Sequence, residues 1–447
     1  MTGLEIVRLA VCVAELCALP LLWLGLHPTR RSAAAAFLAS GWVLACAALA
    51  GILVSSGGSR SFPSIFGTPA DLLLSRVLLG GFFVALCFPA VSLFRLYFFA
   101  LACDLANASL ANVELSVRHL PLHALVVAIY FLPAQLFSRW TRQDRNLYAR
   151  ACLHIVFHSG LLLGVLPALI VACGGGNWNA PFARSSFANK LYLQLLLIPA
   201  VLLISSLQEF ARRGHGTPMP ADPPQRLVTS GPYAYVANPM QIGKFLVVLG
   251  WGFFWWSPWI TATAFLGLLY SVAIASPRED REMTDRFGHA WGEYRQRVRR
   301  WWPRWKPGYG SEDTSAREAS SRRRPVVARL YLQLECGPCR QMAEWMGRQA
   351  PVGLEILPIE DDNYARITYD PGDGAGLEQG IVALARALEH LNLALAFFGW
   401  MIRLPGIAQL AQVLADSFDP QKNFQETACA LPASAGVTLG AELGAER

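Results

Sequence analysis

Two cysteines stand out as residues whose type and spacing could do chemistry. Cys336 and Cys339 form a Cys-Gly-Pro-Cys motif between a predicted strand at 326–334 and a predicted helix that runs to Arg348. The dipole and free N–H groups of a helix N-terminus favour thiolate at Cys336, the predicted attacking sulfur, with Cys339 as resolving thiol. A structural or metal-binding pair is the alternative, but zinc needs two further ligands and none is suitably placed. We therefore predict a redox pair and no metal site.

Paired acids form a second candidate, in the block REDREMTDRFGHAWGEYRQRVRRWWPRWKP after an apolar hairpin. Glu279, Glu282 and Arg286 fall on one face of a predicted helix, and Tyr294 offers an aromatic wall. The block RLVTSGPYAYVANPMQIGKF precedes the hairpin and carries Gly-Pro and Asn-Pro turns. Because a hairpin returns its two ends to one surface, the loop and the acidic helix should meet.

Such a meeting point would suit a small cationic, aromatic ligand. Exposed backbone groups, turn glycines, aromatic rings and paired carboxylates match S-adenosylmethionine, which carries an ammonium, a sulfonium and an adenine. The alternative is a solvated juxtamembrane helix that binds nothing.

These two blocks resemble the isoprenylcysteine carboxyl methyltransferase and phospholipid methyltransferase family, over about residues 190–307. The resemblance implies an integral-membrane enzyme that uses S-adenosylmethionine on a lipid-like, isoprenoid or thiol or carboxylate acceptor. It implies cofactor contacts at these positions of the loop and of the acidic block: Gly231, Pro232, Tyr233, Asn238, Pro239, Gly243, Glu279, Glu282 and Tyr294.

The chain departs from that family pattern at three positions. Ala237, Asn238 and Gln241 stand where the family has Arg, His and Tyr. An Asn side chain can hydrogen-bond but does not titrate near neutrality, so an acid–base role of that His is lost. Methyl transfer mainly needs positioning and exclusion of water, and a thiolate or carboxylate acceptor needs no strong base.

The C-terminal part resembles the thioredoxin-like family called DCC, whose members are described as thiol-disulfide oxidoreductases. The likeness includes the ALARALEHL helix and the WMIRLPGIAQLAQVLADSF end. Further strands are predicted at 353–359 and 366–369, followed by helices at 380–402 and 405–418. Gln333-Leu334 replaces the Asp-Gly that usually precedes the first cysteine. A thioredoxin-like scaffold used only for binding is the rival reading.

Composition separates the elements that must position these sites. The chain has 447 residues, 54% hydrophobic and 15% charged, against about 25% charged in ordinary soluble domains. Residues 1–277 contain only 17 Lys and Arg and 8 Asp and Glu, so this part has membrane composition. Basic loops suit anionic lipid headgroups, and nothing suggests a nucleic-acid partner. Apolar stretches predict spans at 3–26, 33–55, 72–94, 119–137, 151–173, 189–208, 240–256 and 259–276.

The predicted architecture is an all-α multi-pass transmembrane helical bundle of seven to nine spans followed by a small α/β thioredoxin-like domain. We expect the protein to lie in a cell membrane. The Lys and Arg residues of its loops predict that the C-terminal domain is in the cytosol. Two histidine pairs lie at helical spacing, His119 with His123 and His154 with His158. Each pair is more typical of interfacial or hydrogen-bonded core histidines than of metal ligands. The predicted domains are N-terminal helices of unknown role (1–188), a methyltransferase-like domain (189–305), a linker (306–325), a CxxC domain (326–425) and a tail (426–447).

Function follows as three competing hypotheses. The first is an S-adenosylmethionine-dependent membrane methyltransferase with a tethered thiol-redox domain, whose partners are membrane lipids, a lipid-like or small thiol acceptor, and a thiol reductant or protein disulfide. The second is a membrane-anchored thiol-disulfide oxidoreductase whose methyltransferase-like part only anchors or binds. The third is a non-enzymatic scaffold in which both sites are relics.

Overall fold

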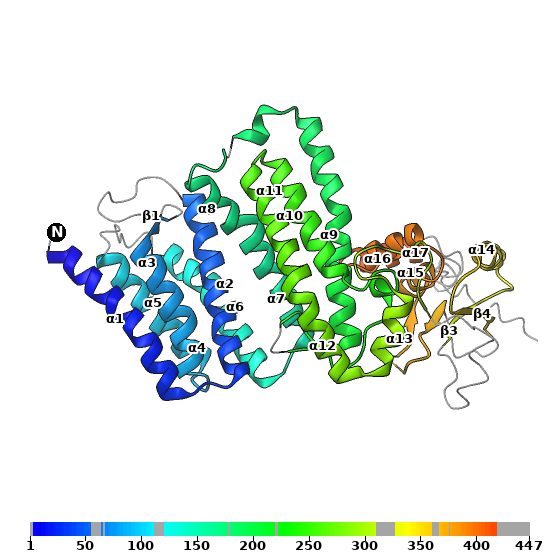
Figure 1. Ribbon diagram of the computed structural model, residues 1–447, viewed down its shortest axis with the longest axis horizontal. Coiled ribbons are helices and arrows are strands. Elements are labelled where there is room, and N and C mark those ends of the chain that lie inside the picture. The colour runs from blue at the N-terminus through cyan, green and yellow to red at the C-terminus, as the bar shows by residue number, and fades with distance from the viewer. Residues whose placement is uncertain are drawn as a thin grey trace, which may run out of the picture.

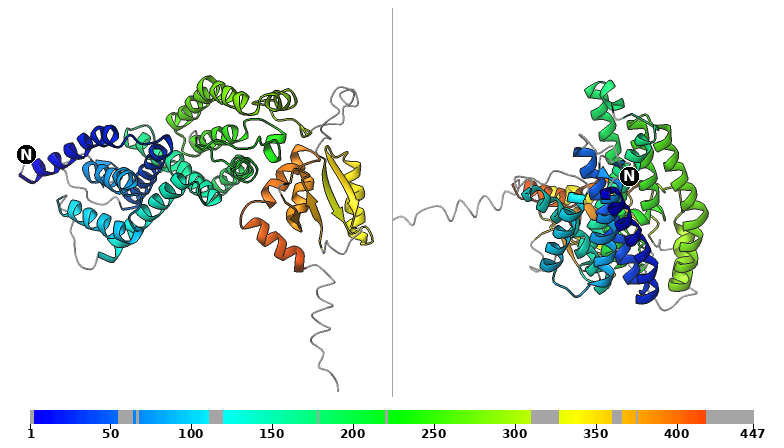
Figure 2. Two further views of the ribbon diagram at one scale, coloured as in Figure 1. Left: turned by 90° about the horizontal axis from the view of Figure 1, so that it is seen from below. Right: turned by 90° about the vertical axis from the view of Figure 1, so that its left-hand side faces the viewer.

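The computed structural model describes residues 3–54, 64–65, 68–110, 120–177, 179–219, 222–309, 327–359, 366–374 and 376–417. His119, most of the predicted linker at 306–325, and the whole predicted tail at 426–447 therefore lie outside the described residues. The N-terminal helices form one end of the elongated molecule and the small sheet region forms the other (Figures 1 and 2).

The N-terminal part is helical. Its elements are α1 (Gly3–Leu26), α2 (Arg30–Val54), the short strands β1 (Ser64–Ile65) and β2 (Thr68–Pro69), α3 (Ala70–Ser75), the π-helical η1 (Arg76–Phe83), α4 (Val84–Cys87), α5 (Leu93–Leu110) and α6 (Leu120–Gln143). They continue with α7 (Leu147–Ser159), the π-helical η3 (Gly160–Val165), α8 (Leu166–Ala172) and the 3₁₀ turn η4 (Ala180–Ala183). Helix α2 packs between α6 and η1, where Ala36, Val43 and Phe131 are buried in the main core cluster.

The middle part, residues 186–297, follows as long helices beside one another (Figure 1). Its elements are α9 (Ser186–Gly214), the 3₁₀ turn η5 (Gly231–Ala234), α10 (Pro239–Phe254), α11 (Pro258–Tyr270), the π-helical η6 (Ser271–Ala275), α12 (Ser276–Phe287) and α13 (His289–Arg297). The predicted hairpin of α10 and α11 is present. Ser257 is the N-cap of α11, and its side chain accepts a hydrogen bond from the Ile260 N–H at 3.3 Å.

Six described helices are long and apolar enough to cross a membrane: 6–26, 93–110, 120–143, 147–171, 186–214 and 258–287. A bent helix pair in the C-terminal part, Leu393–Ile402 with Ile407–Ser417, would raise the count to seven, but this pair is not among the predicted spans. The span predicted at 72–94 does not run to 94 as one helix. The helix stops at Phe88, whose backbone leaves the α region because Pro89 follows, and α5 begins separately at Leu93.

The C-terminal part is a four-stranded sheet with helices. Its elements are β3 (Ala328–Leu332), α14 (Gly337–Arg348), β4 (Leu354–Pro358), β5 (Thr368–Asp370), β6 (Glu378–Gln379), α15 (Ile381–Leu388), α16 (Leu393–Ile402) and α17 (Ile407–Ser417). The strand order is β4-β3-β5-β6, with β3 parallel to β4 and the other pairs antiparallel. The single helix expected over 380–402 is two helices, because Asn392 caps a new start at Leu393.

Candidate functional site

The turn η5 has residue types that its backbone requires. Gly231 has φ +61°, and a Cβ there would lie 3.1 Å from Glu209 Cγ. A side chain would therefore be strained by its backbone and crowded by the glutamate. Pro232 follows near the start of the turn, where its fixed φ is compatible with helical geometry.

The loop and the acidic helices meet, which confirms the contact expected from the hairpin. Asn238 Nδ2 donates to Ser276 Oγ at 3.1 Å, and Gln241 Nε2 donates to Glu279 Oε2 at 3.4 Å. Tyr294 Oη on α13 donates to the Tyr233 carbonyl at 2.9 Å. Residues far apart in sequence thus meet at the N-terminal ends of α10 and α12.

Tyr233 presents an unsatisfied polar atom at this meeting point. Its side chain is buried, and its hydroxyl has no hydrogen-bond partner among the described residues. Burial, with the nearby carboxylates of Glu279 and Glu209, raises the pKa of Tyr233 well above its ordinary value. The hydroxyl therefore stays protonated and is free to donate to a bound molecule.

Three other residues predicted to bind the cofactor have contacts or positions in the fold that involve other parts of the protein. Glu282 pairs with Arg286 at 3.3 Å, and both side chains are partly exposed. Pro239 begins α10. Gly243 lets α10 approach α9, because a Cβ there would lie 2.9 Å from Leu203 Cβ. These contacts explain Pro239 and Gly243 by helix geometry and packing.

A buried charge cluster at the end of α9 was missed by the sequence analysis. We call it the junction cluster: Glu209, Glu378, Arg386, Glu389 and Arg403. Glu209 is 0% exposed and accepts hydrogen bonds from Arg386 Nη1 at 2.9 Å and from Arg403 Nη2 at 2.8 Å. The only sequence signal was a lone acid near the end of an apolar helix.

The junction cluster touches the candidate cofactor loop directly. Ser230 Oγ donates to Glu209 Oε1 at 2.5 Å, immediately before Gly231. Tyr235 Oη donates to the Glu389 carbonyl at 2.9 Å, and its ring lies edge-on to Trp400 with centroids 5.6 Å apart. The C-terminal part is therefore bonded to the same loop that meets α12.

A cavity of about 690 Å³ lies between the middle part of the chain, which carries the 231–238 loop, and the C-terminal part. Ser230 and Tyr294 line it from one side, and Tyr369, Arg386 and His390 line it from the other. Its volume is in the range of small-molecule sites, roughly 300–1,000 Å³. The candidate loop thus opens into a space that both parts enclose.

The cysteine pair has the local geometry that was predicted. Cys336 is the exposed N-cap of α14, and Cys339 is half-buried one turn later. Burial, together with a hydrogen bond to the Cys336 thiol, raises the pKa of Cys339 to about 11. The two thiols therefore differ in exposure, and both are free cysteines.

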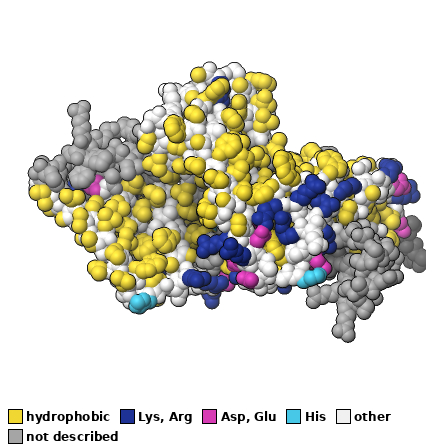
Figure 3. All heavy atoms as spheres, viewed as in Figure 1, with side chains coloured by type: hydrophobic (Ala, Val, Ile, Leu, Met, Phe, Trp, Pro, Cys, Tyr) yellow, Lys and Arg dark blue, Asp and Glu magenta, His cyan; other side chains and the backbone are white. Residues whose placement is uncertain are grey.

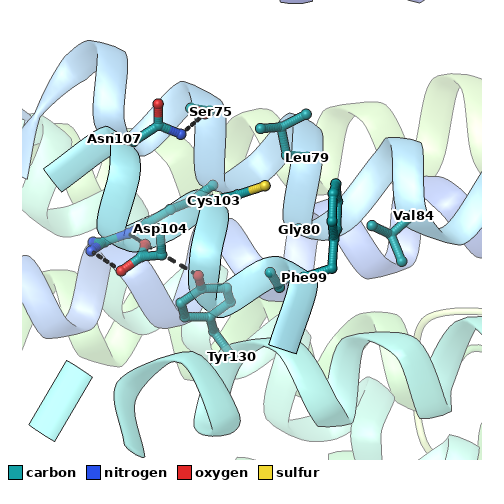
Figure 4. Close-up of a pocket in the computed structure, with 11 residues that line it drawn as sticks. Ser75, Leu79, Gly80, Val84, Phe99, Cys103, Asp104, Asn107 and Tyr130 are labelled. Atoms are coloured by element: carbon teal, nitrogen blue, oxygen red, sulfur yellow. Dashed lines mark hydrogen bonds and ion pairs between the residues drawn. The ribbon is translucent and has the colours of Figure 1, made fainter. Parts of the chain in front are cut away.

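The N-terminal helices contain a second charge cluster, which no sequence motif predicted. Asp104 accepts from Arg76 Nε at 2.5 Å and from Tyr130 Oη at 3.3 Å (Figure 4). Beside it, Asn107 Nδ2 donates to Ser75 Oγ at 2.7 Å. The adjoining cavity is only about 10 Å³, so the cluster is closely packed.

Three of the four histidines in the predicted pairs, His123, His154 and His158, lie in the described residues. His154 is buried, and the carbonyl of His154 lies 2.8 Å from His158 Nδ1. His123 Nδ1 lies 3.6 Å from Asp104 Oδ2. Within the described residues, no group of three or more His, Cys, Asp or Glu side chains could hold a metal ion.

Comparison with known proteins adds one finding. No curated protein and no solved structure matches the chain at a significant level. Residues 192–290 match the family model described as phospholipid methyltransferase, which spans most of α9 through the start of α13. This segment carries Glu209, the 231–238 loop and Glu279, and its similarity to the family supports a membrane methyltransferase.

Proposed function

We propose that the protein is an S-adenosylmethionine-dependent methyltransferase that acts on a lipid-like acceptor at the membrane surface. The observation that carries the proposal is the buried Tyr233 hydroxyl, which lacks a partner among the described residues where the loop meets Glu279. The family match over residues 192–290 and the membrane helices that carry the loop also support it.

The residues of this meeting point fit the proposed cofactor. Tyr233 would donate its unpaired hydroxyl hydrogen, and the carboxylates of Glu279 and Glu282 would face cationic groups. Gly231, Pro232 and Asn238 would supply turn backbone and an amide, and Tyr294 an aromatic wall. When bound, the cofactor would supply an electrophilic methyl group on its sulfonium.

The side chains at this site would position the reactants rather than transfer a proton. Asn238 occupies the family's histidine position, and its amide already bonds Ser276 Oγ at 3.1 Å. It holds the loop to α12 but cannot accept a proton near neutral pH. Burial of Tyr233 and Tyr294 would keep water from the reacting groups. This chemistry favours an acceptor that reacts as an anion, such as a carboxylate or thiolate.

Calorimetry with the detergent-purified full chain tests cofactor binding. We expect Tyr233→Phe to weaken S-adenosylmethionine binding about tenfold, because one hydrogen bond to a buried donor is lost. Glu279→Gln should weaken it about tenfold or more. Glu293→Gln, on the exposed side of α13, is the matched control and should leave affinity unchanged. Absence of binding, or equal effects of all three substitutions, would refute the proposal.

The acceptor class can be tested separately. Transfer of a labelled methyl group from the cofactor to a membrane extract should place the label in the organic-soluble fraction. After unreacted cofactor is removed, labelled product confined to the aqueous fraction would instead indicate a small thiol acceptor. No labelled product in either fraction, despite cofactor binding, would show that the site only binds.

A thiol-disulfide oxidoreductase activity of the C-terminal part is the second candidate. The observations that favour it are the exposed Cys336 at the start of α14 and the higher pKa of its half-buried neighbour. The strand order β4-β3-β5-β6 with α14 after β3 also favours a thioredoxin-like scaffold. Cys336 thiolate would attack a substrate disulfide, Cys339 would resolve the mixed disulfide, and an external dithiol would reduce the resulting Cys336–Cys339 bond.

Reduction of insulin disulfides by dithiothreitol, with the full chain as catalyst, tests this activity. Cys336→Ser should abolish any acceleration, and Cys339→Ser should trap a mixed disulfide. Cys173→Ser, at an exposed cysteine elsewhere in the chain, should change nothing. No acceleration by the unaltered protein would remove this candidate.

A further inference from the structure

Helix α17 is turned with its apolar face outward. Its large hydrophobic side chains are 40–62% exposed, at Ile407, Leu410, Val413 and Leu414. Its polar face points into the C-terminal part, where Gln412 Oε1 accepts from the Ile381 N–H at 2.8 Å and Asp416 pairs with Arg366 at 3.2 Å. A helix on an ordinary water-facing surface has the opposite arrangement.

The helix before it packs against a candidate membrane span. Ala396 and Trp400 of α16 are buried in a cluster with Val201 of α9. Val201 lies one turn before Ser205, where the buried polar residues of α9 begin. One helical turn rises about 5 Å, so α16 contacts α9 within its apolar section.

The two helices form a continuous apolar unit with a sharp bend. Leu393–Ile402 and Ile407–Ser417 together are apolar enough for a membrane span, but they bend by 92° at the break between them. In Figure 3, hydrophobic side chains continue from the membrane helices along the upper edge of the molecule toward this region, with Lys and Arg gathered below. The bend turns α17 away from the line of α16 and leaves its apolar face without protein cover among the described residues.

We propose that α17 is an interfacial membrane helix whose exposed face, from Ile407 to Leu414, inserts into the acyl–headgroup boundary of the bilayer. Helices of this kind bury their apolar face roughly 5–10 Å into that boundary. The occupant is lipid because α16, the adjoining helix, already contacts the apolar section of a membrane span.

This assignment holds the C-terminal part at the membrane in two ways. The junction cluster bonds it to α9 through Glu209, and α17 contacts the lipid beside the bundle. The cavity lined by Ser230 and Tyr369 would then be enclosed close to the bilayer surface. The inference does not depend on methyl transfer.

Photocrosslinking of the full chain in lipid nanodiscs tests the inference. The photoreactive residue p-benzoylphenylalanine replaces Leu410 in one variant and Leu414 in a second, both at exposed positions where folding should tolerate it. A third variant carries it at Glu344, an exposed position on α14, as the matched control. The excited ketone abstracts a hydrogen from a nearby C–H bond, and the two radicals join as a new C–C bond.

We expect phospholipid adducts at positions 410 and 414, seen by intact mass, at least tenfold above the yield at position 344. Crosslinks to a second copy of the chain or to another protein would overturn the inference and identify a protein interface. Equal lipid yields at all three positions, or no lipid adduct at 410 and 414, would overturn it as well. Cofactor binding measured on the same variants reports separately on the proposed function.

Discussion

The two buried charge clusters differ in what they connect. In the N-terminal helices, Arg76 and Asp104 are 28 positions apart and belong to neighbouring elements of one bundle. In the junction cluster, Glu209 is 177 positions from Arg386 and 194 from Arg403, and it joins a membrane span to the C-terminal part. One cluster holds a bundle together, whereas the other fixes how two parts of the chain dock.

The difference also concerns how many partners each charge has. Asp104 has one arginine partner, with Tyr130 and His123 nearby. Glu209 pairs with Arg386 and Arg403, which also share Glu389, and it lies 3.8 Å from a third arginine, Arg213. Burying such charges gives little net stability compared with apolar packing, but breaking a buried pair is costly because the remaining charge stays desolvated. We therefore expect the junction cluster to favour one docking geometry.

Breaking the junction should have the largest effect. Glu209→Gln leaves both Arg386 and Arg403 with less negative charge and should cost about 5 kcal/mol of docking free energy. Faster hydrogen exchange in α15 and α16 would report it. Glu282→Gln, in a partly exposed pair, is the control and should cost less than about 1 kcal/mol. Equal exchange in the two variants would refute a docking role for Glu209.

Breaking the N-terminal cluster should come next. Asp104→Asn leaves the buried Arg76 without its carboxylate and should cost about 3–4 kcal/mol of unfolding free energy. Thermal unfolding in detergent measures it, with exposed Asp285→Asn as control. Because the cluster lies in another part of the molecule, S-adenosylmethionine affinity should not change. A loss of affinity would mean that the two parts are coupled.

Acid should also loosen the junction side. His390 is buried, and its Nε2 lies 2.9 Å from Tyr369 Oη. Burial lowers the pKa of His390 from 6.5 to about 4. Between these values the unfolded chain binds the proton and the folded chain does not, so stability falls as pH decreases from 6.5 to 4. The loss should reach about 3 kcal/mol.

The measurement is hydrogen exchange in β4 and α15 as a function of pH, corrected for intrinsic rates. His390→Gln removes the titrating group and should flatten the dependence. An unchanged slope in that variant would assign the acid sensitivity to another group.

A substitution at the loop should have the smallest effect. Gly231→Ala places a side chain at φ +61° and 3.1 Å from Glu209 Cγ, which should cost about 1–2 kcal/mol and weaken cofactor binding. Gly292→Ala is the control, since a Cβ at this helical position meets nothing within 4 Å. It should be neutral or stabilising. If Gly231→Ala were equally harmless, the loop would not need its observed backbone.

Much of the fold follows from local patterns. Apolar runs bounded by turn residues predicted α1, α6, α9 and the hairpin of α10 and α11, and strand patterns predicted β3, β4 and β5. The hairpin also predicted that the loop would meet α12, since its two ends must return together. The helix predicted at 72–94 ends early because Pro89 disfavours helical backbone at Phe88, and the helix predicted at 380–402 is divided because Asn392 caps a new helix.

The sequence by itself determined where most helices and strands lie, which residues form the turn at Gly231, and that Cys336 begins a helix. Only the tertiary structure revealed that Glu209 bonds Arg386 and Arg403, that Gly243 packs on Leu203, and that α17 turns its apolar face outward. The physical reason is range. Turn, cap and hydrophobicity preferences act over a few residues, whereas charge pairing and close packing depend on which distant segments the fold brings together.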